Sequence, residues 1–208
     1  MGLRVEGVTQ VVAVLHIRSE TNLVAVFMLQ RLLQFTTNRY KICQNLISIG
    51  DDFWIENEEG KRVFKVDGKV LRIRNTLVFE DVNGKKLAQI QERLLTIKDT
   101  MAIEDADGDQ LAVVKKALIA PLRDRWDVKV KNGPALDVQG DFLDHEYSIK
   151  QGRNKIAEVS KKWFSLTDTY GVEINPGQND ILILAVAIAI DMMAHDDDGK
   201  KRKDRKGR

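Results

Sequence analysis

The sequence predicts an all-β fold that closes around one buried, hydrophobic helix near the C-terminus. Two observations lead to this expectation. Glycine-containing turn motifs recur at nearly regular intervals, and the segments beside them alternate between polar and apolar residues. One run near the C-terminus is apolar on every side. A chain of 208 residues, 43% of them hydrophobic, can form one such domain with a substantial core.

The turn motifs form a repeat over residues 57–60, 81–84, 105–108, 131–133 and 151–154. The first four glycines recur about every 24–25 residues. Asn-Gly and Asp-Gly pairs supply the positive φ angles that tight hairpins require, and the flanking segments have the period of two of a half-buried strand. We therefore expect roughly ten to twelve strands, mostly antiparallel, in a sandwich or barrel.

The C-terminal helix is expected to begin at Asn179 or Asp180, either of which can act as an N-cap. Residues 181–190 are all Ile, Leu, Val or Ala, and Asp191 then interrupts the run. A helix that is apolar all round must be buried all round, in a protein core or in a bilayer. Because a spanning helix needs ~20 apolar residues and this run is shorter, we expect a helix in the core, with a membrane anchor as the alternative.

Composition constrains the organisation but names no partner, since the net charge is only +2. No interdomain linker interrupts the strand-rich part. We expect an N-terminal extension of unassigned structure at residues 1–35, a barrel domain at 36–195, and a charged, disordered tail at 196–208. The single cysteine, Cys43, excludes a disulfide framework. This favours a cytoplasmic location, with peripheral attachment to a membrane as an option.

Few residues are candidates for catalysis or metal binding. The best of them is His145, with the carboxylates of Asp141 and Asp144 nearby, but short polar side chains at such positions more commonly bind the backbone of a turn. Residues 105–109 are similar to the start of a calcium loop, but Lys116 replaces the glutamate required at its twelfth position. We expect no enzymatic activity, no cofactor and no metal site.

Basic residues are the remaining candidates for a binding site. Two guanidinium groups near lysines would suit an anion such as a phosphorylated headgroup. The alternative is ordinary strand-edge charge, which protects sheets from edge pairing. Specific recognition of nucleic acid is not evident. The candidate anion- or lipid-binding residues are Lys115, Lys116, Arg123, Arg125, Lys161 and Lys162.

Several motifs resemble those of the LURP-one-related family: IGDDF at residues 49–53, VFKVDGK at 63–69, VQGDFLDHEY at 138–147, VSKKWF at 159–164 and DTYGV at 168–172. The resemblance covers roughly residues 40–194. It implies a tubby-like fold, shared with phospholipid scramblases, in which a closed antiparallel barrel of about twelve strands surrounds a hydrophobic helix.

The resemblance implies less about function than about fold, because the activity of the family is poorly defined and a fold does not determine a function. Tubby domains bind phosphoinositides, but none of their lipid-binding residues can be matched here one by one. We expect a non-enzymatic binding or scaffold module for anionic phospholipid headgroups or a protein partner. The alternatives are a scramblase-like protein anchored by the C-terminal helix, and an enzyme that uses Asp141, Asp144 and His145.

Overall fold

The structure, a computed structural model, describes residues 37–43, 53–71, 74–93, 100–117, 125–163 and 169–206. The side chains of residues 43, 69–71, 74–75 and 195–206 lie outside this description, among them that of Cys43. The described part contains strands and one long helix. The elements are β1 (Asn38–Cys43), β2 (Phe53–Asn57), β3 (Arg62–Leu71), β4 (Arg74–Asp81), β5 (Lys86–Glu92), β6 (Thr100–Asp105), β7 (Gln110–Lys116), β8 (Arg125–Val130), β9 (Leu136–Asp141), β10 (Glu146–Gln151), β11 (Asn154–Ser160), β12 (Thr169–Ile174) and α3 (Asp180–Lys206).

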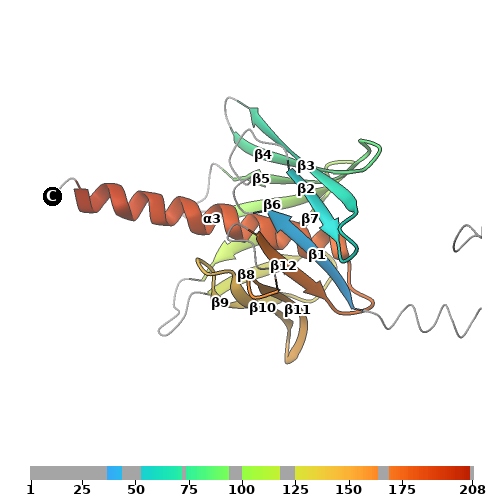
Figure 1. The fold of residues 1–208 in the computed structure, drawn as a ribbon. Helices are drawn as coiled ribbons and strands as arrows, with labels where there is room; N and C mark the ends of the chain where they lie inside the picture. Colours follow the sequence, from blue (N-terminus) through green and yellow to red (C-terminus); the bar gives the residue numbers. More distant parts are fainter. Residues whose placement is uncertain are drawn as a thin grey trace, which may run out of the picture. The chain divides into compact units, whose positions relative to one another are not determined.

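The twelve strands form one closed antiparallel barrel in which sequence neighbours pair with each other (Figure 1). Strand β1 closes the barrel, because it pairs with β2 on one side and with β12 on the other. Each strand in a closed barrel has two neighbours, so no row of backbone groups is left unpaired at an edge. The predicted barrel around a C-terminal helix is confirmed.

The first three turns of the glycine repeat, which join β2 to β3, β4 to β5 and β6 to β7, share one design. In the β4–β5 turn, the Asp81 Oδ1 atom accepts hydrogen bonds from the backbone N–H groups of Asn83 and Lys85 at 2.8 and 2.9 Å. Gly84 has a φ of 79°, which a residue with a Cβ rarely adopts. Asn57 and Asp105 accept the corresponding pairs of hydrogen bonds in the β2–β3 and β6–β7 turns. The calcium-like motif at residues 105–109 is thus a hairpin turn, as predicted.

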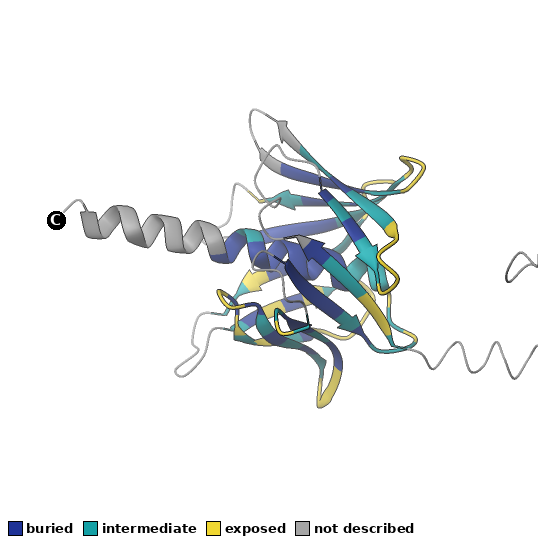
Figure 2. Ribbon diagram, in the orientation of Figure 1, coloured by how far each residue is buried: buried dark blue, intermediate teal, exposed yellow. Residues whose placement is uncertain are grey.

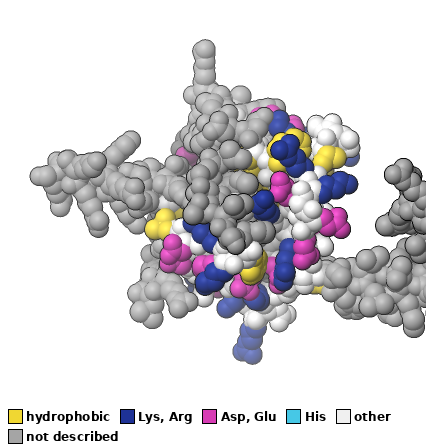
Figure 3. All heavy atoms as spheres, viewed as in Figure 1, with side chains coloured by type: hydrophobic (Ala, Val, Ile, Leu, Met, Phe, Trp, Pro, Cys, Tyr) yellow, Lys and Arg dark blue, Asp and Glu magenta, His cyan; other side chains and the backbone are white. Residues whose placement is uncertain are grey.

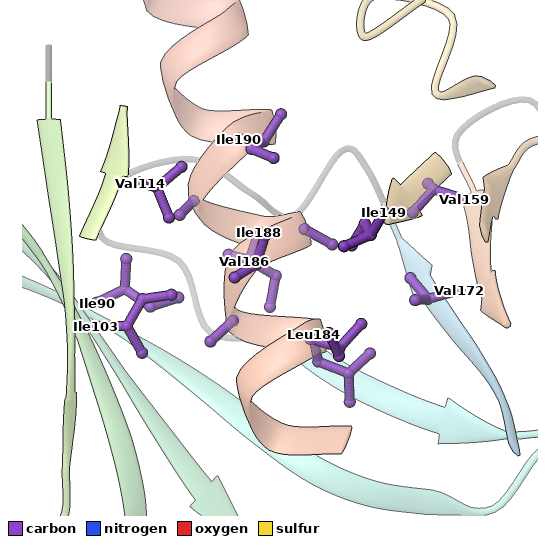
Figure 4. Packing of buried hydrophobic residues seen from close by; sticks show 14 of the residues in the cluster. Ile90, Ile103, Val114, Ile149, Val159, Val172, Leu184, Val186, Ile188 and Ile190 are labelled. Carbon is purple, nitrogen blue, oxygen red and sulfur yellow. The ribbon is translucent and has the colours of Figure 1, made fainter. Parts of the chain in front are cut away.

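Helix α3 passes through the barrel and forms the centre of its core. Every residue from Ile183 to Ile190 is at most 2% exposed (Figure 2). The helix contacts β5, β6, β7 and β12. Figure 4 shows its large side chains between strand residues such as Ile103 and Val172. Burial of each large aliphatic side chain contributes about 1.5–3 kcal/mol, so this helix supplies a large share of the stability.

Helix α3 begins where the sequence predicts and is longer than expected. Asn179 is the N-cap, since its Oδ1 accepts the N–H of Leu182 at 3.1 Å. The helix continues to Lys206, into the segment that we expected to be a separate tail. The domain division itself stays a prediction. Within the described residues, no helix is both long and apolar enough to cross a membrane.

The barrel has two different ends. The hairpins of the repeat and the start of α3 lie at one end, which we call the turn end. The antiparallel registers place the last residues of β7, β9 and β11 and the first residues of β8 and β10 at the opposite end. Helix α3 reaches that end near Asp191, which contacts His145 in the β9–β10 turn. We call it the helix-exit end.

Candidate functional site

The described candidates for anion binding all lie at the helix-exit end, in two groups. Lys115 and Lys116 end β7 and lie beside Arg125, the first residue of β8. Lys161 and Lys162 directly follow β11. Strands β8, β9 and β10 separate β7 from β11, which puts the groups about 19 Å apart along the wall at ~4.8 Å per strand. Arg123, the sixth candidate, lies outside the described residues.

The group on β7 and β8 is only partly available for an external anion. The Arg125 Nε atom lies 2.9 Å from Asp137 Oδ1 and 3.4 Å from Asp127 Oδ1, so carboxylates of its own barrel already balance its charge. The Lys116 ammonium lies 5.6 Å from the centroid of the Trp126 ring, in cation–π contact. Lys115 is exposed, although the register places Asp127 opposite it.

The group after β11 is organised by Glu146. Its carboxylate accepts hydrogen bonds from the Ser160 hydroxyl at 2.8 Å, the Lys161 N–H at 3.1 Å and the Lys162 ammonium at 3.1 Å. Burial opposes ionisation of Glu146, but the hydrogen bonds from Ser160 and Lys162 outweigh it and lower the pKa of this carboxyl group. The Lys162 side chain is 79% exposed, so it can still contact a ligand.

Acidic side chains are interspersed with the basic ones on the visible face, so no continuous basic patch appears there (Figure 3). The same mixture holds at the helix-exit end, where Asp141 and Asp144 are exposed in the β9–β10 turn. Within the described part of the chain, the barrel therefore offers separated cations rather than one concentrated anion site.

The three residues of the possible acid–base site do not converge. Asp141 and Asp144 are exposed, and Asp141 Oδ1 accepts the backbone N–H of Asp144 at 3.1 Å. This is the backbone-binding function predicted for the turn carboxylates. His145 instead points into the core, where it is 0% exposed and its Nε2 lies 2.6 Å from Asp191 Oδ1. We expected the imidazole, like the carboxylates, to bind the turn backbone, and we did not predict its contact with Asp191.

Sequence reasoning missed the partnership between His145 and Asp191 because 46 residues separate them. The available signal was Asp191 itself, a single carboxylate at the end of an apolar run. Tyr170 stacks on the imidazole with ring centroids 4.4 Å apart. Burial and then the negative charge of Asp191 raise the pKa of both Tyr147 and Tyr170. Each of these four residues is at most 4% exposed, which suits a structural contact better than substrate chemistry.

Comparison with known proteins agrees with the fold. The model of the LURP-one-related family matches residues 38–191. "Uncharacterized protein YxjI" of Bacillus subtilis is 32% identical over 69 residues, covering 33% of this chain and 43% of that protein, so the chain spans less than half of this relative. An X-ray structure of an Arabidopsis thaliana protein has a TM-score of 0.56 and 19% identity, covering 74% of this chain and 90% of that one. At that identity the likeness establishes the fold alone.

Proposed function

The chain belongs to the LURP-one-related family, and from this premise we propose that it is a non-enzymatic binding module that recognises anionic phospholipid headgroups with the helix-exit end of its barrel. Cytoplasmic location at the periphery of a membrane is part of the proposal. One observation carries it: every described candidate cation, from Lys115 on β7 to Lys162 after β11, lies at this single end.

The C-terminal sequence supports the same orientation. Helix α3 reaches the helix-exit end near Asp191, and the backbone continues from there into residues 200–208, of which seven are Lys or Arg. A basic segment beside an anionic surface contributes about 1 kcal/mol per cation. The sequence from 196 to 208 has seven cations against four aspartates, a net charge of +3, so it is basic although Asp196, Asp197 and Asp198 precede the run.

Three other functions make different demands on the same residues. An acidic protein partner would use the same cations. A scramblase-like anchor would require α3 to leave the barrel, and the burial of residues 183–190 makes that step costly. An enzyme that uses Asp141, Asp144 and His145 would need these side chains to move together, because the turn and the core now hold them apart.

Liposome co-sedimentation tests the proposal. We expect the full chain to bind vesicles containing phosphatidylserine or a phosphoinositide, to ignore vesicles of phosphatidylcholine, and to be released by salt. The double variant Lys115→Glu/Lys161→Glu removes one cation from each group. At about 1 kcal/mol per lysine, binding should weaken about 30-fold or more.

The matched control is Lys85→Glu/Lys86→Glu, which makes the same change of charge at the turn end. It should bind nearly as well as the unmodified chain. Equal losses in both variants would show a general charge effect and contradict the proposed orientation. Absence of salt-sensitive binding to every anionic vesicle would contradict lipid recognition and leave the protein partner as the better candidate.

A further inference from the structure

We infer that the contact between His145 and Asp191 fixes the register of α3, meaning its depth and rotation inside the barrel. This inference does not depend on the proposed function. Asp191 is 3% exposed and His145 is 0% exposed, so the contact lies inside the core. The 2.6 Å separation of Nε2 and Oδ1 is that of a short hydrogen bond. A displaced helix would leave the Asp191 carboxylate buried without the imidazole, which is strongly unfavourable.

The apolar run specifies the position of the helix only in part. Its side chains are only Ile, Leu, Val and Ala, with Ala at 185, 187 and 189 alternating with larger residues. Moving the helix by four residues would replace Leu184 by Ile188, which conserves volume, but Ile183 by Ala187, which does not. Cores accept the volume-conserving exchanges, losing uniqueness before stability, whereas the others leave cavities. A buried polar contact adds a requirement that no aliphatic exchange can meet.

Two aspartates fix the helix at opposite ends of the barrel. Asp180 Oδ2 accepts hydrogen bonds from Asn38 Nδ2 at 2.7 Å and from the Tyr40 hydroxyl at 2.6 Å, both on β1 at the turn end. Asp191 makes its contact with His145 in the β9–β10 turn, at the helix-exit end. Eleven residues make about three turns, which brings both carboxylates to the same face of α3. A single depth and a single rotation satisfy both contacts.

The β9–β10 turn is built so that His145 cannot follow a moving helix. His145 adopts a φ of 52°, which is uncommon for a residue with a Cβ and persists only where surrounding contacts hold it. Its ring is held against Tyr170. Gly140 has a φ of 153° and lies against the opposite strand, where an added Cβ would approach the Glu146 carbonyl oxygen to 2.3 Å. The imidazole is therefore a fixed reference point for the helix.

The double variant Asp191→Leu/His145→Leu tests this inference, because it removes both partners without leaving an unpaired charge. In methyl spectra with labelled isoleucine, Ile183, Ile188 and Ile190 should each give one resonance in the unmodified chain. We expect the double variant to fold cooperatively but to give several resonances, or broadened ones, for these three residues. Asp191→Asn keeps an acceptor oxygen for Nε2–H and should restore single resonances.

The control is Lys41→Met/Glu56→Met. It removes an ion pair of the barrel wall, with Nζ and Oε2 2.9 Å apart, whose side chains are partly exposed and alternate with the buried Ile42 and Ile55. It should keep one resonance for each isoleucine. If Asp191→Leu/His145→Leu also shows one unshifted set, the apolar packing alone fixes the register and the inference is wrong. If the double variant fails to fold, His145 and Asp191 are needed for the helix to enter the barrel at all. That result would also overturn the inference, which concerns only the position of the helix.

Discussion

Asn57, Asp81 and Asp105 perform the same task in the β2–β3, β4–β5 and β6–β7 hairpins. Each side-chain oxygen accepts backbone N–H groups two and four residues further along the chain. Each hydrogen bond satisfies a turn amide that would otherwise have to find water. An Asn or Asp recurs at this turn position, which explains why the turns could be predicted from the sequence. The contact of His145 could not be predicted in this way, because its partner Asp191 lies on another element.

Asp81 should make stability depend on pH. The hydrogen bond from the Lys85 N–H is the main reason that the pKa of Asp81 lies below its usual value of 3.8. A lowered folded-state pKa means that the ionised carboxylate stabilises the fold above pH 3.8, and that this contribution is lost as the pH falls through the folded-state value. Urea unfolding at neutral pH and at about pH 3 should show the difference between the unmodified chain and Asp81→Asn shrinking in acid.

Asn57 provides the matched comparison, since it holds the same turn position with a neutral amide. Asn57→Asp should create a pH-dependent contribution of the same sign in the β2–β3 hairpin. An effect of Asp81→Asn that stays constant across this range would show that the charge of the carboxylate does not matter to the turn.

At the scale of elements, α3 differs from an ordinary surface helix because no face of it is polar between Ile183 and Ile190. The sequence predicted this helix, its N-cap and its burial from the absence of a polar stripe. Its extension to Lys206 was not predicted, because a charge-rich segment follows the core-forming part. The segment contains no proline, so the backbone can continue as a helix there, even through Gly199, which weakens a helix.

Ala187→Asp tests the environment of the helix centre. Ala187 is 0% exposed and belongs to the hydrophobic core cluster, where the Tyr147 hydroxyl already donates to its backbone carbonyl oxygen at 3.5 Å. A buried, unpaired charge costs several kcal/mol, comparable with the whole stability of a domain, so the variant should not fold at neutral pH. Ala187→Ser, which adds only a hydroxyl that can bond to the preceding turn, is the control and should remain folded. Circular dichroism and denaturant titration provide the measurement, and a cooperative, native-like Ala187→Asp would contradict burial of this face.

At the scale of the whole molecule, local patterns predict hairpins but not the closure between β1 and β12. Thr169 pairs with Cys43 across more than half of the chain, and only the number of strands and the family resemblance indicated a barrel. The candidate anion site was predicted only as a set of cations. The ion pairs of Arg125 with Asp137 and of Lys162 with Glu146 depend on strand register and reduce the positive charge that the sequence implies.

The central claim is that α3 is the core of the barrel and not a membrane anchor. Its most direct test compares the full chain with a chain that ends at residue 178, both purified without detergent and examined by near-ultraviolet circular dichroism and by denaturant unfolding. We predict that the full chain unfolds cooperatively and that the shortened chain lacks fixed aromatic packing, because the buried surface of the barrel has lost its partner. A shortened chain that stays folded, while the full chain requires detergent, would show that α3 is an anchor and contradict this account.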